Sequence, residues 1–208
     1  MATAAADPAM GAAVAEDPVP TDGRRARRHR SRDVAVDALL DLLDEGVLRP
    51  TAQQVAERSG VSLRSIFRIF EDVQSLHEAA TTRHLSRVGH LFVTLDDRGD
   101  LPARIDSTTA ALARVYEAVG PIRRAALRLA PESEVFAQRL ERARQWLRGE
   151  LDRVFAAELT SPGADGTRSA ALEALLSFEA WDQLRGGQGL SVEQAMEVLR
   201  RTALTLLR

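Results

Sequence analysis

The stretch that decides the fold is Thr51-Ala52-Gln53-Gln54-Val55-Ala56-Glu57-Arg58-Ser59-Gly60-Val61-Ser62-Leu63-Arg64-Ser65-Ile66-Phe67-Arg68-Ile69-Phe70. Thr51 is a favourable N-cap for a short helix over about 52–58, and Ser62 is one for a second helix over about 63–69. Between them, Gly60 can take the left-handed backbone conformation of a tight turn at little steric cost. The stretch therefore predicts a helix-turn-helix.

The side chains of this stretch divide into an inner and an outer set. Ala56 is small enough for the two helices to cross closely, and Val55, Val61 and Ile66 are expected in a small core. If Phe67 and Phe70 also face inward, the second helix presents Arg64, Ser65 and Arg68 to solvent. Such a short basic face fits the major groove of DNA. The alternative is that these arginines are solvated surface residues.

The residues before this stretch predict one helix and a basic arm. Spacing of three and four residues predicts a helix over about 32–46, through Val34, Ala38, Leu39, Leu42 and Leu43. It follows an arginine-rich arm, residues 24–32, in which Arg28 and Arg30 are candidates for contacts with phosphates or with the minor groove. The alternative for the arm is a disordered polar tail. Residues 1–23, rich in Ala, Pro and Asp, are predicted to be disordered.

The charge is unevenly distributed along the chain. The formal net charge is −2, but residues 24–70 hold ten arginines against six acidic residues, a net of +4. Residues 1–23 carry −4, and residues 71–208 carry −2. One basic segment between two acidic ones is typical of a module that meets phosphate.

The rest of the chain is predicted to be helical. Asp72 is expected to cap a long helix over about 73–96, and Pro102 begins a segment that Gly120-Pro121 interrupts, with a short helix to about Leu129. A long helix through Phe136 and Phe155 follows, then a loop at 160–166, a helix at about 168–185, and a final helix from the Ser191 cap to about Leu207. We therefore expect an all-α protein of about nine helices, with a DNA-binding domain at 24–76 and a helical domain at 77–208.

Several classes of protein are disfavoured. The chain has no cysteine, which excludes disulfides and Cys-ligated zinc, and the spacing of His77, His84 and His90 suits no metal site. We expect no cofactor and no catalysis, because a phosphate loop, a nucleophile elbow and a dinucleotide fingerprint are all missing. Without a signal peptide or a membrane-spanning stretch, a cytoplasmic location is expected.

Residues 32–90 resemble the TetR family of bacterial regulators, whose DNA-binding region reads approximately T-x-x-x-[IV]-A-x-x-[AS]-G-V-S-x-x-[TS]-[LI]-[YF]-x-x-F. The matching residues are Thr51, Val55-Ala56, Ser59-Gly60-Val61-Ser62, Ser65-Ile66-Phe67 and Phe70. The resemblance implies a ligand-responsive regulator that binds a palindromic operator as a homodimer. Repression is the simpler mode, since a dimer on promoter DNA needs only to occlude polymerase. A helical adaptor or small-molecule-binding protein without specific DNA binding is the alternative.

The resemblance also indicates where each partner binds. The candidate DNA-binding residues are Thr51, Ser62, Arg64, Ser65, Phe67 and Arg68, with Arg28 and Arg30 of the arm. The family usually has Tyr, whose hydroxyl reaches a phosphate, where Phe67 stands, and often Lys where Val73 stands. These two departures predict fewer backbone contacts, for which the arm is expected to compensate.

Two further sets of residues follow from the resemblance. Candidates for a small-molecule pocket are Leu91, Leu95, Tyr116, Phe136, Trp146 and Phe178. Candidates for a dimer interface are Ala171, Ala174, Leu175, Phe178, Ala195, Met196, Leu199 and Ala203. The alternative for both sets is packing in the protomer's own core.

Overall fold

The computed structural model describes residues 21–161 and 166–208, so the predicted disordered segment up to residue 20 lies outside the described residues. The described residues form ten α-helices, two 3₁₀ turns (η1, η2) and one π turn (η3), with no strand in these ranges. This confirms the all-α prediction, with one helix more than expected. In chain order the elements are α1 (Thr21–Asp44), α2 (Ala52–Ser59), α3 (Leu63–Ile69), α4 (Val73–Val88), η1 (Gly89–Leu91), α5 (Leu101–Leu129), η2 (Ala130–Glu132), α6 (Glu134–Val154), α7 (Ala156–Leu159), α8 (Gly166–Leu175), α9 (Phe178–Asp182), η3 (Gln183–Gly187) and α10 (Val192–Leu207).

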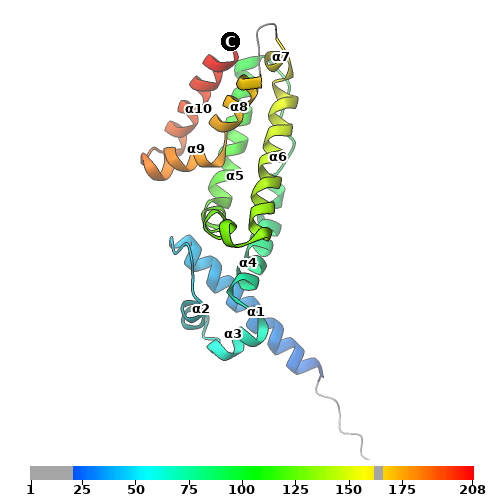
Figure 1. Ribbon diagram of the computed structural model, residues 1–208, viewed down its shortest axis with the longest axis vertical. Helices are drawn as coiled ribbons and strands as arrows, with labels where there is room; N and C mark the ends of the chain where they lie inside the picture. Colours follow the sequence, from blue (N-terminus) through cyan, green and yellow to red (C-terminus); the bar gives the residue numbers. More distant parts are fainter. Residues whose placement is uncertain (1–20, 162–165) are drawn as a thin grey trace, which may run out of the picture.

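The helices form two groups that share α4 (Figure 1). At one end, α1, α2 and α3 pack together, and α1 also packs against α4. At the other end, α5 packs against α4, α6 and α10, and α8 packs against α6 and α10. The three N-terminal helices therefore contact the bundle through the packing of α1 against α4 and α5.

Helix α1 is longer than predicted. The sequence placed its start near residue 32, whereas the helix begins at Thr21 and includes the arginine-rich arm. The predictions of a separate arm and of disorder at 21–23 are therefore wrong. Arg and Ala are strong helix formers, so once the buried part of α1 supplies a nucleus their own propensity extends the helix through the arm.

Helix α4 is shorter than predicted, because it ends at Val88 and not near residue 96. Gly89 and the run Phe92-Val93-Thr94 have weak helix propensity. Beyond them, the Leu95 N–H donates to Glu150 Oε2 at 2.7 Å, and the Leu95 carbonyl accepts from Arg153. These bonds fix the non-helical connection against α6.

Helix α5 runs through Gly120 and Pro121, where the sequence predicted a break. An interior proline costs roughly 3 kcal/mol. Val119, Ile122 and Ala125 are all buried around it, and His84 Nε2 lies 2.8 Å from the Ala118 carbonyl. Burial of apolar side chains on both sides of Pro121 outweighs the lost hydrogen bond, and one continuous helix results.

The predicted helix at 168–185 is divided in two. Ser177 Oγ accepts from the Ala180 N–H at 3.1 Å and so caps a new helix, α9, which leaves α8 at an angle (Figure 1). The final helix begins after Ser191 and ends at Leu207, as predicted.

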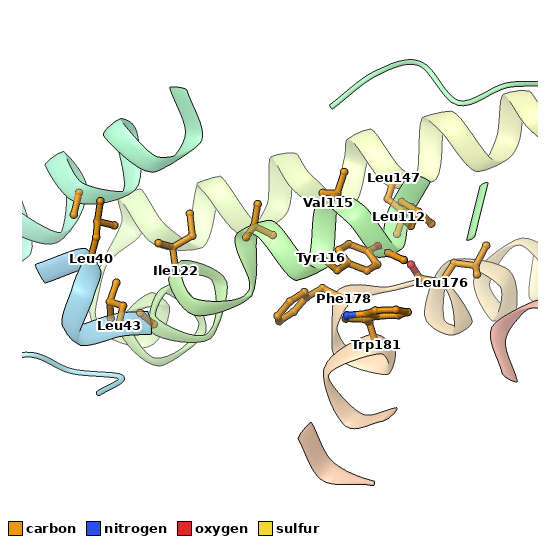
Figure 2. Close-up of a cluster of buried hydrophobic side chains, with 14 of the residues drawn as sticks. Leu40, Leu43, Leu112, Val115, Tyr116, Ile122, Leu147, Leu176, Phe178 and Trp181 are labelled. Atoms are coloured by element: carbon orange, nitrogen blue, oxygen red, sulfur yellow. The ribbon is translucent and has the colours of Figure 1, made fainter. Parts of the chain in front are cut away.

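Aromatic side chains join α5 to α9 in the core (Figure 2). The rings of Tyr116 and Phe178 meet edge to face, with centroids 5.7 Å apart. The Tyr116 hydroxyl donates to the Leu176 carbonyl at 2.6 Å, and the Trp181 indole N–H donates to Glu117 Oε1 at 2.9 Å. Both polar ends are thus bonded while the rings fill the core, and burial raises the pKa of Tyr116, which keeps its hydroxyl neutral.

Candidate nucleic-acid interface and core cavity

The helix-turn-helix is held by caps at three points. Thr51 Oγ1 accepts from the Gln54 N–H at 3.2 Å, and the Gln54 side chain accepts from the Thr51 N–H at 2.9 Å, a reciprocal capping box. Gly60 has φ of 68°, and its N–H bonds to the Ala56 carbonyl at 3.0 Å. Ser62 Oγ accepts from the Ser65 N–H at 3.3 Å. The caps and turn predicted at Thr51, Gly60 and Ser62 are confirmed.

Helix α3 is anchored by one face and open on the other. Ile66 and Phe70 are buried in the core. Leu63, Arg64, Phe67 and Arg68 are exposed, and 51 % of Phe67 is accessible. The prediction that Phe67 faces inward is therefore wrong. A helix turns about 100° per residue, so Phe67 lies on the side of Leu63, one turn before it, and away from Ile66.

Ser65 is half-buried, and its hydroxyl accepts from Ser62 Oγ at 3.0 Å. The exposed face of α3 is therefore formed by two basic and two apolar side chains, with the serine pair at its N-terminal edge.

The arginines around the helix-turn-helix are of two kinds. Arg58 is paired with Glu45 through two bonds of 2.7 and 2.8 Å, which tie α2 to the end of α1 and lower the pKa of Glu45. By contrast, neither Arg64 nor Arg68 has an ion pair with any residue in the described part of the chain. Arg58 is thus engaged within the protein, and the two α3 arginines hold their charge in solvent.

The arginine-rich start of α1 is an exposed helical extension. Arg28 and Arg30 are exposed, and Ala35 is the first fully buried residue of the helix. The Arg32 guanidinium lies 5.0 Å from the centre of the Phe70 ring, at the point where α1 joins the core. A helix with side chains is roughly 10–12 Å wide, and a minor groove is about 6 Å wide. The helical backbone of this extension is therefore too wide to lie inside a minor groove.

The histidines of α4 and η1 each interact with a different part of the backbone. His77 is buried, and burial lowers its pKa, while its interaction with the Pro50 backbone opposes that shift. His84 bonds to α5, and His90 Nδ1 lies 3.1 Å from the Arg87 carbonyl. In residues 21–161 and 166–208, no group of three or more His, Cys, Asp or Glu side chains is placed to hold a metal ion.

A cavity of about 400 Å³ lies between α4, α5, α6 and the α8–α9 corner. Three of the six predicted pocket residues, Tyr116, Trp146 and Phe178, lie on its wall. Leu91 and Leu95 do not line it and instead pack in the main core, and Phe136 packs with Ala126 and Leu140 in a second cluster. The volume lies within the range of small-molecule sites.

Of the α5 side of this wall, the sequence predicted Tyr116 and missed the other residues. Val119, Ile122 and Arg123 line the cavity together with Val115 and Tyr116. The predicted break at Gly120-Pro121 separated these residues into two helices, whereas the continuous α5 places them on one face. Their helical spacing was the signal that could have found them.

Comparison with known proteins gives the family of the fold. No protein-family model and no curated protein matches the chain. Among solved structures, a TetR-like transcriptional regulator from Rhodococcus sp. RHA1 aligns with a TM-score of 0.57 and 20 % identity, over 86 % of this chain and 95 % of that one. A TetR transcription regulator from Haloarcula marismortui ATCC 43049 aligns with the same TM-score and 18 % identity, over 86 % and 97 %. The chain has a TetR-like fold.

Within this TetR-like fold, the residues predicted for a dimer interface lie in different surroundings. Ala195, Leu199 and Ala203 are buried on the side of α10 that packs against α5 and α8, and Phe178 lies on the cavity wall. These four are core residues of one protomer, and their assignment to the interface is wrong. Ala171 and Ala174 are exposed, and Leu175 and Met196 are half-buried. The part of the TetR-like chain that the structure describes holds no helix long and apolar enough to cross a membrane.

Proposed function

We propose that the protein is a transcriptional regulator that binds a palindromic DNA operator as a homodimer. The observation that carries the proposal is the exposed face of α3, on which Arg64 and Arg68 are unpaired while Ile66 and Phe70 fix the helix from behind. An arginine held on a rigid helix can donate two parallel bonds to the guanine edge in the major groove. Arg64 and Arg68 are therefore the proposed base-reading residues.

The other predicted contacts are assigned to the DNA backbone. Thr51 and Ser62 stand at the N-termini of α2 and α3, where free N–H groups and the helix dipole favour a phosphate. Ser65 lies one turn after Ser62. Arg28 and Arg30, on the extension of α1, are proposed to contact phosphates outside the major groove. Their change to Gln is expected to lower the slope of log affinity against log salt by about one per lost phosphate contact.

Two copies are needed for a useful affinity, because one α3 contacts a single half-site. The proposed dimer face consists of exposed positions of α10, beside its buried residues Ala195, Leu199 and Ala203, together with Ala171 and Leu175 of α8. On α10 they include Val198, of which 40 % is accessible, and Thr202. Small residues on two neighbouring helices allow close packing with a second copy. A monomer in light scattering at micromolar concentration would contradict this part.

Ligand response is proposed to act through α4. Thr81 and Leu85 of α4 line the cavity, and the same helix begins at its Asp72 cap, two residues after Phe70. An occupant that favours one position of α4 therefore favours one orientation of α3. A shift of about 100-fold in operator affinity requires about 2.7 kcal/mol of preference for one state. Repression, by occlusion of polymerase, is the proposed direction of control.

The test is selection of bound fragments from random DNA, followed by footprinting on the selected site. The Arg64→Ala/Arg68→Ala variant is expected to lose specific protection. Arg114→Ala/Arg142→Ala is the control, since it removes the same charge from exposed positions of α5 and α6. Selection of no sequence, or equal loss in both variants, would contradict the proposal and favour a helical adaptor without specific DNA binding.

A further inference from the structure

Arg123 is a cation placed on the inner wall of the cavity. It lies on α5, lines the cavity with Tyr116 and Phe178, and only 12 % of its side chain is accessible. Its guanidinium carbon is 5.3 Å from the centre of the Phe178 ring. The stacked ring stabilises the charge but supplies no hydrogen-bond acceptor.

The hydrogen bonds of this guanidinium are incomplete. Its partner is Glu179, whose Oε1 lies 3.4 Å from Arg123 Nη2, at the long limit of a hydrogen bond. Arg123 Nε is buried and has no hydrogen-bond partner among the described residues. A buried donor without an acceptor destabilises the state that contains it. Arg123 therefore has unused donor capacity that a better acceptor can satisfy.

Glu179 is a weak and replaceable partner. Its side chain is 46 % accessible, whereas that of Arg123 is almost buried. It also lies in the first turn of α9, where the helix dipole stabilises its carboxylate without Arg123. Glu179 can thus turn to solvent at small cost when another anion approaches the guanidinium.

The other groups on the wall favour an apolar body for the ligand. The rings of Phe92 and Trp146 meet edge to face, with centroids 5.8 Å apart, and Val115, Val119 and Ile122 line the α5 side. The Tyr116 hydroxyl is already bonded to the Leu176 carbonyl, so this residue offers its ring and not its hydroxyl.

The remaining charged groups of the wall have partners of their own. Arg139 donates to Thr82, Arg144 pairs with Glu141, and Glu173 pairs with Arg148. Of the charged side chains lining the cavity, Arg123 has the longest ion pair, and among the described residues it is the one with a buried donor that lacks a hydrogen-bond partner.

We propose that the cavity binds an organic carboxylate with an apolar, ring-containing or chain-like body, and that the carboxylate pairs with Arg123 in place of Glu179. The inference rests on the proposed ligand response and gives it a chemical class. A planar guanidinium matches the two oxygens of a carboxylate, and the surrounding apolar wall strengthens the pair. A neutral ligand of the same shape leaves Arg123 with its long bond to Glu179.

The experiment compares acids with amides of the same skeleton. The full chain is titrated in a calorimeter, without DNA, with 2-naphthoate, 4-phenylbutyrate and decanoate, and with the primary amide of each. Trp146 lies on the wall, so its fluorescence gives a second readout. For the skeletons that fit, the acid is expected to bind at least about tenfold more tightly than its amide.

Three variants test whether the preference for acid over amide comes from Arg123. Arg123→Gln is expected to remove the difference between acid and amide. Arg124→Gln is the matched control, because Arg124 is the next residue of α5, pairs with Asp182 at 2.9 Å and does not line the cavity, and it should keep the difference. Glu179→Gln is expected to tighten acid binding, since the competing carboxylate is gone. This third variant also tests the inference if Arg123→Gln fails to fold.

Equal binding of acids and amides, no binding of any acid by the folded chain, or a preference that survives Arg123→Gln would overturn the inference. These outcomes are separate from the test of DNA binding. A chain that binds the acids but selects no DNA keeps the carboxylate site and refutes the regulator. A chain that selects an operator but binds none of the acids keeps the regulator and refutes the carboxylate site.

Discussion

Arg83 Nη1, on α4, lies 3.2 Å from Asp37 Oδ1, on α1. Arg83 also pairs with Asp33, and Arg87 pairs with Asp37 at 3.0 Å. Helix α4 lines the cavity, and α1 packs against α2 and α3, so this cluster links the two ends of the molecule. These ion pairs join α1 and α4 in addition to the packing of their apolar side chains.

Loss of Arg83 is expected to affect coupling more than stability. The side chain is 24 % accessible and its partners about half, so Arg83→Gln should lower the free energy of unfolding by no more than about 1 kcal/mol. The change in operator affinity on adding a bound acid should shrink, because α4 then moves with less effect on α1. Urea unfolding and DNA titration with and without acid measure the two effects.

Arg98→Gln is the control for Arg83→Gln, since Arg98 pairs only locally with Asp96 in the segment before α5. An unchanged response to the acid in Arg83→Gln would show that the cluster carries no coupling.

Gly60 and Gly149 are expected to respond to alanine in opposite directions. At both positions an added Cβ meets open space, so only backbone conformation differs. Gly60 has φ of 68°, and Gly60→Ala should lower the free energy of unfolding by about 1–2 kcal/mol. Gly149 lies within α6, and Gly149→Ala should raise it by roughly 0.5–1 kcal/mol. Two changes of the same sign in chemical denaturation would contradict this assignment.

The helix caps were predicted correctly from the sequence for a local reason. Caps at Thr51, Ser62, Asp72 and Ser191 are set by contacts within three residues, and each is where the sequence predicted it. The exposed position of Phe67 also follows from helical spacing alone. The apolar character of its ring, which suggested an inward-facing side chain, concealed it.

The failures lie where distant residues decide the local structure. Pro121 remains helical because burial on both of its sides outweighs its own preference. Leu95 leaves the helix because Glu150 and Arg153, more than fifty residues later, bond its backbone. An apolar stripe such as Ala195, Leu199 and Ala203 suits both the core of one protomer and a dimer interface. In the structure this stripe packs against α5, which assigns it to the core. Spacing along one helix contains none of this information.

Phe67→Tyr is expected to strengthen operator binding. The ring is 51 % accessible on the face of α3 that carries Arg64 and Arg68, so an added hydroxyl can reach a phosphate. One such hydrogen bond is worth about 1 kcal/mol, or about fivefold in affinity per half-site. The salt dependence should not change, because a neutral hydroxyl displaces no counterion.

The control for this change is Phe67→Leu, which keeps an apolar side chain at the same exposed position of α3 and adds no hydroxyl. Fluorescence anisotropy with the selected operator measures both variants. Unaltered affinity in Phe67→Tyr would place this face of α3 away from the backbone.

His77 is expected to make stability depend on pH in the neutral range. The pKa of His77 is below its usual 6.5, mainly because burial penalises the charged ring. The nearby charge of Arg49 lowers this pKa further, whereas the interaction with the Pro50 backbone raises it. Below pH 6.5 the unfolded chain therefore binds a proton that the folded chain resists. The contribution to stability is full above pH 6.5 and falls as the pH drops toward the lowered pKa of the folded state.

Urea unfolding at about pH 7.5 and about pH 5.5 covers this window before carboxylates titrate. His77→Gln should flatten the change, whereas His90→Gln, at an exposed position, should keep it. Because His77 interacts with Pro50, next to the Thr51 cap, acidification in this window should also destabilise α2. An equal change of stability with pH in His77→Gln and His90→Gln would contradict this role of His77.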